Sequence, residues 1–162
     1  MICTRIASSY LYTRIAKRLT SPSVDGLELG QSMEILVQNG LPLVTALVIY
    51  KGNQLTLDTM LLDTGSASTL LSTNRVQEIG LVPTPDDPIH EIRGVGGIEV
   101  VFSKTIDYLS VGELAVEDFE VEIGAMEYGF EIDGIIGLDF LTRTKALINL
   151  DGLEITGFTS QI

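Results

Sequence analysis

Short runs of β-forming residues, separated by glycine-containing turns, constrain the fold of this chain more than any other feature of its sequence. Residues 33–37 and 43–50 are rich in apolar and β-branched side chains, and Asn39-Gly40 between them is a strong signal for a tight hairpin turn. Gly52-Asn53 then turns the chain into 54–62, where apolar and polar residues alternate. Repeated units of this kind predict an all-β fold, a small closed barrel.

The rest of the chain continues this pattern, with one or two short helices expected. A helix is predicted at 73–79, capped by Thr73 or Asn74 and ended by Gly80, and three prolines at 83, 85 and 88 predict an exposed loop after it. From Phe119 onward apolar and acidic residues alternate, and we interpret these acids as the solvated face of a strand. Further strands are expected at 98–106, 108–111, 116–123, 147–150 and 153–156, the last two joined at Asp151-Gly152.

Charge divides the chain into two unequal parts. All 22 acidic residues lie at or after Asp25, whereas four of the ten basic residues precede it, and the net charge is −12. We therefore expect residues 1–32 to be an N-terminal extension, either flexible or helical, and residues 33–162 to be the folded domain. So acidic a domain repels phosphate backbones, which argues against nucleic acid as a partner.

The cysteine count and the apolar runs bear on the compartment. Cys3 is the single cysteine, so an intrachain disulfide is impossible. The longest nearly unbroken apolar stretch, at 41–50, is shorter than the roughly 20 residues that a membrane-spanning helix needs. These features predict a cytoplasmic protein without an integral membrane segment. The sequence also has no Cys/His cluster with zinc spacing and no phosphate-binding Gly-Lys-Ser/Thr loop, so we expect neither a metal nor a cofactor.

The stretch Leu-Leu-Asp-Thr-Gly-Ser-Ala-Ser-Thr-Leu-Leu at 61–71 carries the clearest chemical signal. Its two leading leucines predict a strand that enters the core and leaves Asp63 at the interior. A lone carboxylate there is costly to ionise, but two that meet on a symmetry axis share one proton and titrate as a pair. Such a pair supplies a general base and a general acid to one water without a metal. Taken alone, Asp-Thr-Gly is a common turn whose aspartate can bond its own backbone, and most such matches are not catalytic.

Three segments in order resemble those of retropepsin-like aspartic proteases, in particular the bacterial type. The first is the Asp-Thr-Gly-Ser loop at 63–66, and the second is a glycine-rich flap tip formed by Arg93, Gly94, Val95, Gly96, Gly97 and Ile98. The third is the apolar-apolar-glycine segment Ile135, Ile136 and Gly137, which in this family packs beside the active-site loop. The resemblance covers about 43–155 and implies a barrel of the acid-protease type.

The resemblance also implies roles for the matching residues. Asp63 is expected to be the catalytic acid and base, and Thr64 to reach across a dimer axis to the partner's loop. Gly65 is expected to let the two loops approach, and Ser66 to donate a hydrogen bond to Asp63. Because the chain carries one Asp-Thr-Gly loop, a second copy is expected to supply the other aspartate, giving a homodimer. The implied substrate is an extended peptide bound between the flaps and the barrel, with Val95 and Ile98 as candidate pocket residues.

Two alternative functions stay open at this level, and two further residues are given a structural interpretation. The same fold serves equally as a catalytically silent peptide- or protein-binding module, because function lies in the site and not in the fold. The basic N-terminal segment suits a membrane-surface interaction protein. His90, the single histidine, is interpreted as a surface-loop residue, and Asp139 as a structural acid that bonds backbone or a basic residue.

Overall fold

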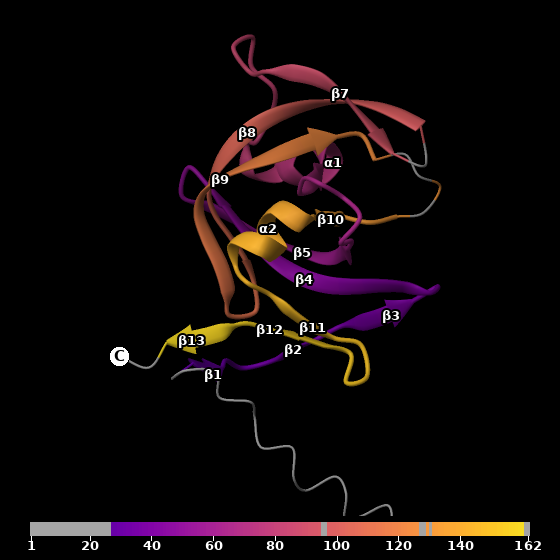
Figure 1. Ribbon diagram of the computed structural model, residues 1–162. Coiled ribbons are helices and arrows are strands. Elements are labelled where there is room, and N and C mark those ends of the chain that lie inside the picture. The colour runs from indigo at the N-terminus through magenta and orange to yellow at the C-terminus, as the bar shows by residue number, and fades with distance from the viewer. Residues whose placement is uncertain (1–26, 95–96, 127–128, 130, 161–162) are drawn as a thin grey trace, which may run out of the picture.

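The computed structural model describes residues 27–94, 97–126, 129 and 131–160, and within them the chain is all-β with two short α-helices (Figure 1). The strands are β1 (Leu27–Leu29), β2 (Met33–Glu34), β3 (Leu36–Gln38), β4 (Leu41–Tyr50), β5 (Asn53–Leu62), β6 (Leu70–Ser72), β7 (Ile89–Gly94), β8 (Gly97–Val111), β9 (Leu114–Gly124), β10 (Gly134–Ile136), β11 (Leu147–Asn149), β12 (Glu154–Thr156) and β13 (Phe158–Ser160). The helical segments are α1 (Thr73–Val76), the 3₁₀ turn η1 (Gln77–Ile79) and α2 (Leu138–Arg143).

The main sheet closes on itself, which confirms the predicted barrel. Its strand order is β3-β4-β5-β10-β6-β9-β8-β7, and an additional pairing of β4 with β8 joins the two halves into a ring. Side chains that point into this ring form the principal core, because alternate residues of a strand face opposite sides of a sheet. Among the fully buried members are Val48, Leu57, Met60, Leu71, Ile106, Leu109, Ile123, Ile136 and Phe140.

Tight turns connect the first strands of the barrel. Asn39 and Gly40 both have positive φ, 54° and 78°, as the predicted hairpin turn between β3 and β4 requires. The next turn uses Lys51 and Gly52, at φ 49° and 78°, and lies one residue earlier than the predicted Gly52-Asn53 because Asn53 already pairs with Tyr50. The loop around Asp151-Gly152 comprises residues 150–153, since Asn149 pairs with Glu154, and is longer than the expected Asp151-Gly152 turn.

The predicted helix at 73–79 is present as α1 followed by η1, and Gly80 ends it in the left-handed conformation. The prediction of its cap was wrong. Ser72 holds the N-cap position without a side-chain hydrogen bond, and the Thr73 hydroxyl instead donates to the carbonyl of Gly124 at the end of β9. The helix start is therefore fastened to the barrel by a contact that is distant in sequence.

Two further predictions need correction. The expected strands 98–106 and 108–111 are one continuous strand, β8, because it pairs with β9 over 102–111 and, over 108–110, also with β4. The pairing of β1 with β13 places a strand inside the range 1–32 that was predicted to be an extension. Residues 1–26 lie outside the described residues.

Candidate active site

Strand β10 lies between the two strands that lead into and out of the Asp-Thr-Gly loop. It pairs in parallel with β5, Ile136 opposite Leu62, and antiparallel with β6, Ile135 opposite Leu70. The loop at 63–69 therefore starts and ends on neighbouring positions around one short strand. The amide of Asp63 continues the ladder by donating to the carbonyl of Ile136 at 3.1 Å. Ile135, Ile136 and Gly137 thus lie beside the loop, as the resemblance implied.

Asp63 is held by a turn built from its own loop. Its Oδ1 accepts the amide N–H of Gly65 at 2.8 Å, and its carbonyl accepts the N–H of Ser66 at 3.2 Å. A Cβ at Gly65 would approach Asp63 Oδ1 to 3.1 Å, so a glycine suits this close contact. The Asp63 side chain is half-buried and Thr64 and Gly65 are exposed in the single chain. The acid therefore sits at an accessible position with one oxygen oriented by backbone.

Ser66 does not make the contact expected of it. Its hydroxyl donates to the carbonyl of Ser68 at 2.8 Å instead of to Asp63. This hydrogen bond links two residues of the same loop, two positions apart, as hydrogen bonds from serine side chains in turns commonly do. In this chain Ser66 therefore shapes the second half of the loop, while the backbone amide of Gly65 serves the aspartate.

Helix α2 supports the loop through hydrogen bonds from its first turn. Its first two amides, those of Leu138 and Asp139, donate to the carbonyls of Ser66 and Ala67 at 2.8 and 3.3 Å. The Asp139 carboxylate accepts both the amide and the hydroxyl of Thr69, at 2.9 and 2.7 Å. Asp139 is a structural acid, as predicted. Thr69 was not predicted, because nothing in its local sequence shows that a residue 70 positions away completes its hydrogen bonds.

Gly137 joins β10 to α2 where the loop passes closest to it. A Cβ there would lie 2.4 Å from the carbonyl carbon and oxygen of Ser68 and 2.9 Å from the amide of Thr69. All three contacts are with backbone, which cannot move aside as the end of a flexible side chain can. The Gly137 amide donates to the Thr69 hydroxyl at 3.2 Å. The glycine is therefore required for the loop to rest on this strand.

The predicted flap tip is the end of the β7–β8 hairpin, and we call residues 89–94 and 97–102 of this hairpin the flap. Arg93 pairs with Ile98 and Gly94 with Gly97, while Val95 and Gly96 lie outside the described residues. Ile98 is 58% exposed and lies on the opposite face from Ile92 and Val101, since alternate strand residues face opposite sides.

The inner face of the flap packs with side chains of β5, β6 and β10, the strands around the Asp-Thr-Gly loop. Ile92 and Val101 belong to a second hydrophobic cluster, separate from the barrel core, that also contains Leu61 and Ile135. Its other members are Leu41, Leu43, Leu70, Met126 and Ile132. Ile92, Leu61 and Ile135 are only partly buried, so they offer an apolar surface next to Asp63. Ile92 and Leu61 were not among the predicted site residues.

His90 and the acidic face of β9 differ from their predictions. His90 lies on strand β7 and not in a loop, and its Nε2 is 3.0 Å from Glu122 Oε1. Glu122 is buried, and its other oxygen accepts the hydroxyl of Ser103 at 3.3 Å. Glu122 therefore does not belong to a solvated face, whereas Glu117, Asp118 and Glu120 are exposed as expected.

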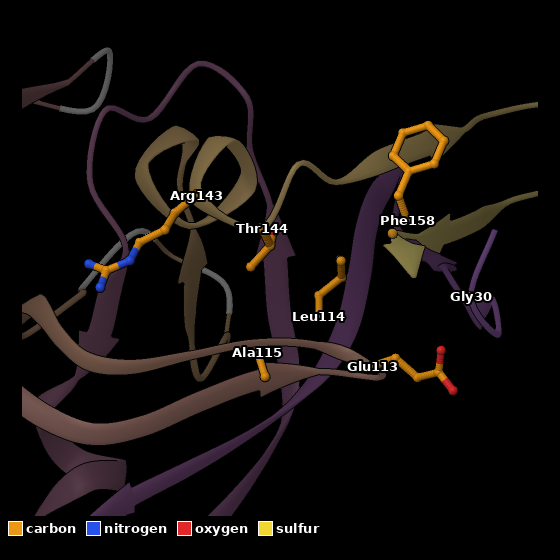
Figure 2. Close-up of a pocket in the computed structure, with 8 residues that line it drawn as sticks. Gly30, Glu113, Leu114, Ala115, Arg143, Thr144 and Phe158 are labelled. Atoms are coloured by element: carbon orange, nitrogen blue, oxygen red, sulfur yellow. The ribbon is translucent and has the colours of Figure 1, made fainter. Parts of the chain in front are cut away.

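A hollow of about 260 Å³ lies away from these residues (Figure 2). It is lined by the β8–β9 turn, the end of α2 and the start of β13, at Gly30, Glu113, Leu114, Ala115, Arg143, Thr144, Gly157 and Phe158. The Arg143 guanidinium stacks over the Phe119 ring at 5.6 Å, and Figure 2 shows that Arg143 and Glu113 extend in different directions. The hollow has no element in common with the Asp-Thr-Gly loop or the flap.

Two properties of the described residues bear on membranes and metals. Among the residues that the structure describes, no helix is long and apolar enough to cross a bilayer. In the same part of the chain, no three His, Cys, Asp or Glu side chains gather as a metal site would require.

Comparison with known proteins identifies a family and solved structures of similar fold. The family model described as aspartyl protease matches residues 46–140, a range that includes the Asp-Thr-Gly loop, the flap and β10. The chain is also similar to the crystal structure of a retropepsin-like aspartic protease from Rickettsia conorii, with a TM-score of 0.57 and 18% sequence identity. That similarity covers 82% of this chain and 95% of the other. No curated protein matches the sequence significantly.

Proposed function

The chain belongs to the aspartyl protease family, whose model matches more than half of it, and on this premise we propose that it is a homodimeric aspartic endopeptidase. Each subunit contributes Asp63 to a pair of carboxylates on the dimer axis. The fold is that of a retropepsin-like protease, which is consistent with this assignment.

The observation that carries the proposal is that a single chain holds one accessible, oriented aspartate, Asp63, in a supported loop. The carboxylate is accessible and oriented by the Gly65 amide, and the loop is supported by Gly137 and Asp139. Peptide hydrolysis by this chemistry needs two carboxylates, one as base and one as acid. The sequence contains one Asp-Thr-Gly. The aspartate of the similar Asp58-Thr59 pair stands within strand β5, and Asp139 is engaged by Thr69. A second copy of the chain is therefore the source of the second acid.

The proposed reaction keeps one proton between the two Asp63 carboxyl groups. The ionised Asp63 takes a proton from a water as its oxygen attacks the peptide carbonyl carbon, and the protonated Asp63 donates to the carbonyl oxygen. The resulting diol collapses when one hydroxyl returns its proton to a carboxylate and the other carboxyl protonates the departing nitrogen. The C–N bond breaks, and the pair again holds one proton.

Thr64 and Gly65 suit the dimer axis in this proposal. Both are exposed in the single chain. Thr64 would bond the partner's loop and hold the two aspartates at a fixed separation, and Gly65 would let the loops approach without side-chain contact. Ser66 acts within its own loop, through its bond to Ser68.

The proposed substrate is an extended segment of a protein, bound between the flap and the loop. Its side chains would enter apolar pockets formed by Leu61, Ile135 and Ile92, three of the partly buried members of the second hydrophobic cluster. Main-chain hydrogen bonds with the flap would supply affinity that is independent of sequence. The net charge of −12 favours the approach of neutral or basic segments as a steering effect.

Cleavage of a peptide library across about pH 3 to 8, by the wild type and by Asp63→Asn, tests this function. The amide of asparagine keeps an oxygen for the Gly65 N–H but cannot share the proton, so the variant should fold and be inactive. Cleavage by the wild type alone, blocked by a statine-containing peptide, is the expected result. A folded dimer that cleaves nothing at any pH would contradict the proposal and favour a peptide-binding module.

A further inference from the structure

Glu99 places a carboxylate on the inner face of the flap, close to its tip. It pairs with Ile92 across the hairpin and lies two residues from Gly97, on the same face as Val101. Its Oε1 accepts the backbone N–H of Met126 at 2.7 Å, in the segment that follows β9. The side chain is half-buried. This contact joins the end of the flap to the wall of the barrel.

The wall is shaped to receive this carboxylate. A Cβ at Gly124 would lie 2.4 Å from Glu99 Oε1 and 3.0 Å from its Cδ, so the oxygen occupies the space that any other residue would fill. Two residues later Met126 has a φ of 57°, an uncommon conformation for a residue that is not glycine. Its side chain is buried in the cluster that contains Val101. The absence of a side chain at Gly124 and the positive φ of Met126 thus both occur next to the Glu99 Oε1 atom.

A hydrogen bond to an ionised acceptor is stronger than one between neutral groups, roughly twofold. A contact of this strength near the tip of a hairpin affects how readily the tip separates from the barrel. The flap of the proposed protease must lift to admit an extended peptide and close over it afterwards. The Glu99 contact and the His90–Glu122 pair nearer the base both join the inner face to β9 or the residues after it.

We propose that Glu99 is a positioning residue that holds the flap closed over the catalytic loop. Its carboxylate accepts the Met126 N–H in the space left by the missing side chain of Gly124, and we call this contact the latch. The inference rests on the proposed protease function for its consequence, which is that the latch sets the affinity for peptide. It acts through the position of Ile92 and the flap backbone, and the chemistry at Asp63 does not use it.

Three variants and one control separate a latch from a general structural contact. Glu99→Ala removes the acceptor, and Glu99→Gln retains an acceptor oxygen. Gly124→Ala keeps the glutamate but places a methyl group where its carboxylate lies, so the carboxylate must move. Glu91→Ala is the matched control, because Glu91 lies on the same hairpin but on the opposite, exposed face, opposite Val100. Urea unfolding of each variant measures global stability separately.

Amide hydrogen exchange measures the latch without any need for turnover. In the wild-type dimer the Met126 amide should exchange slowly. We expect about tenfold faster exchange at Met126 and at the flap amides in Glu99→Ala and Gly124→Ala, since a charge-assisted bond is lost. Glu99→Gln should restore most of the protection, and Glu91→Ala should match the wild type. Unchanged exchange at Met126 in Glu99→Ala would overturn the proposal.

The consequence for substrate is tested by peptide kinetics. Glu99→Ala should raise KM by about tenfold and change kcat less than about twofold, because the latch acts on closure and not on the proton transfers. The affinity for a statine-containing peptide, measured by calorimetry, should fall by the same factor. Faster exchange with unchanged peptide affinity would overturn the functional role. A wild type without activity would contradict the protease function, while exchange and calorimetry would still decide the latch.

Discussion

Thr69 and Asp139 show how two residues outside the Asp-Thr-Gly triplet determine where Asp63 stands. Asp139 accepts three hydrogen bonds, from the amide and hydroxyl of Thr69 and from the amide of Phe140. The Thr69 hydroxyl in turn accepts from Gly137. Loop, strand β10 and helix α2 therefore meet at one carboxylate. The Asp139 carboxylate holds these backbone segments in position. Asp139 and Asp63 differ in role because Asp139 accepts three hydrogen bonds, whereas the Asp63 carboxylate accepts one among the described residues, from Gly65.

Replacing Asp139 by asparagine should destabilise the protein without a change of side-chain size. Both carboxylate oxygens of Asp139 accept hydrogen bonds. In asparagine one of them becomes an NH₂ group, which is a donor and cannot accept the hydrogen bond that the oxygen accepted. We expect a loss of about 1 to 3 kcal/mol in the free energy of unfolding and a lower kcat/KM, measured by urea denaturation and peptide cleavage. Asp151→Asn, the same change in an exposed turn, should alter stability by less than about 0.5 kcal/mol. Equal stability of the two variants would count against the role of Asp139.

Gly137→Ala tests the close approach of β10 to the loop. The added methyl would meet Ser68 backbone atoms at 2.4 Å, so the loop must shift. We expect a loss of about 1 to 3 kcal/mol in stability and at least about a tenfold loss of kcat/KM in the protein that remains folded. The control is Gly52→Ala, at a φ of 78° with open space around it. Its backbone strain should lower stability by about 1 kcal/mol and leave activity per folded dimer unchanged.

At the scale of elements, the proline-rich loop before the flap is held to β8 by a lysine. Lys104 Nζ donates to the carboxylate of Asp87 and to the carbonyl of Val82, and the Thr84 amide also donates to Asp87. The hydrogen bond from Lys104, followed by that from the Thr84 amide, holds the pKa of Asp87 below its ordinary value of 3.8. This loop enters β7, so its anchor also fixes the base of the flap.

The Asp87 anchor makes part of the stability depend on pH. Because its pKa is lower in the folded protein than in the unfolded chain, the contribution is fully present above the ordinary value of 3.8 and is lost as pH falls through the lowered pKa. The stability difference between wild type and Asp87→Asn should therefore be constant near neutral pH and shrink in acid. Thermal unfolding of both proteins as a function of pH measures it. Asp86→Asn, on the exposed neighbour, should track the wild type, and a pH-independent difference at Asp87 would contradict this account.

Elements whose signals are local were predictable from the sequence, and elements that depend on distant partners were not. The Asn39-Gly40 turn and the helix before Gly80 follow from conformational preferences of a few adjacent residues. By contrast, strands were expected separately at 98–106 and 108–111, yet β8 is continuous because neighbouring strands pair with it on both sides. The bond from Thr73 to Gly124 and the pairing of β1 with β13 likewise join residues far apart in sequence.

The candidate site follows the same division. The Asp-Thr-Gly triplet, the flap glycines and the Ile-Ile-Gly segment are contiguous in sequence and were recognisable as motifs. Thr69, Glu99 and Met126 were not, because each matters through hydrogen bonds to residues in another element. Such pairs have no signature in a single sequence, since a glutamate on a strand is ordinarily a solvated side chain.

At the scale of the whole molecule, the proposal depends on two copies sharing one site. The loop exposes Thr64 and Gly65, and Leu138 beside it is 44% exposed, a large apolar side chain at the place where a partner would stand. Exposed apolar side chains of this kind are commonly covered by association. Each copy carries a net charge of −12, so the two repel at long range, and the contacts at the axis must overcome this repulsion.

A mixing experiment tests whether two chains form one active site. If each Asp63 serves in one shared pair, a dimer of one wild-type chain with one Asp63→Asn chain is inactive, because the asparagine cannot share the proton. At equal amounts and full exchange, wild-type homodimers form about one quarter of all dimers by random pairing. Activity at constant total protein should then fall to about one quarter of the pure wild-type value, following the square of the wild-type fraction. A site that is complete within one chain would instead retain about one half, a linear dependence.

Subunit exchange, followed by fluorescence transfer between labelled chains, must be complete before the assay, and sedimentation must show dimers throughout. Under those conditions a quadratic curve supports the shared pair, and a straight line shows that Asp63 acts alone.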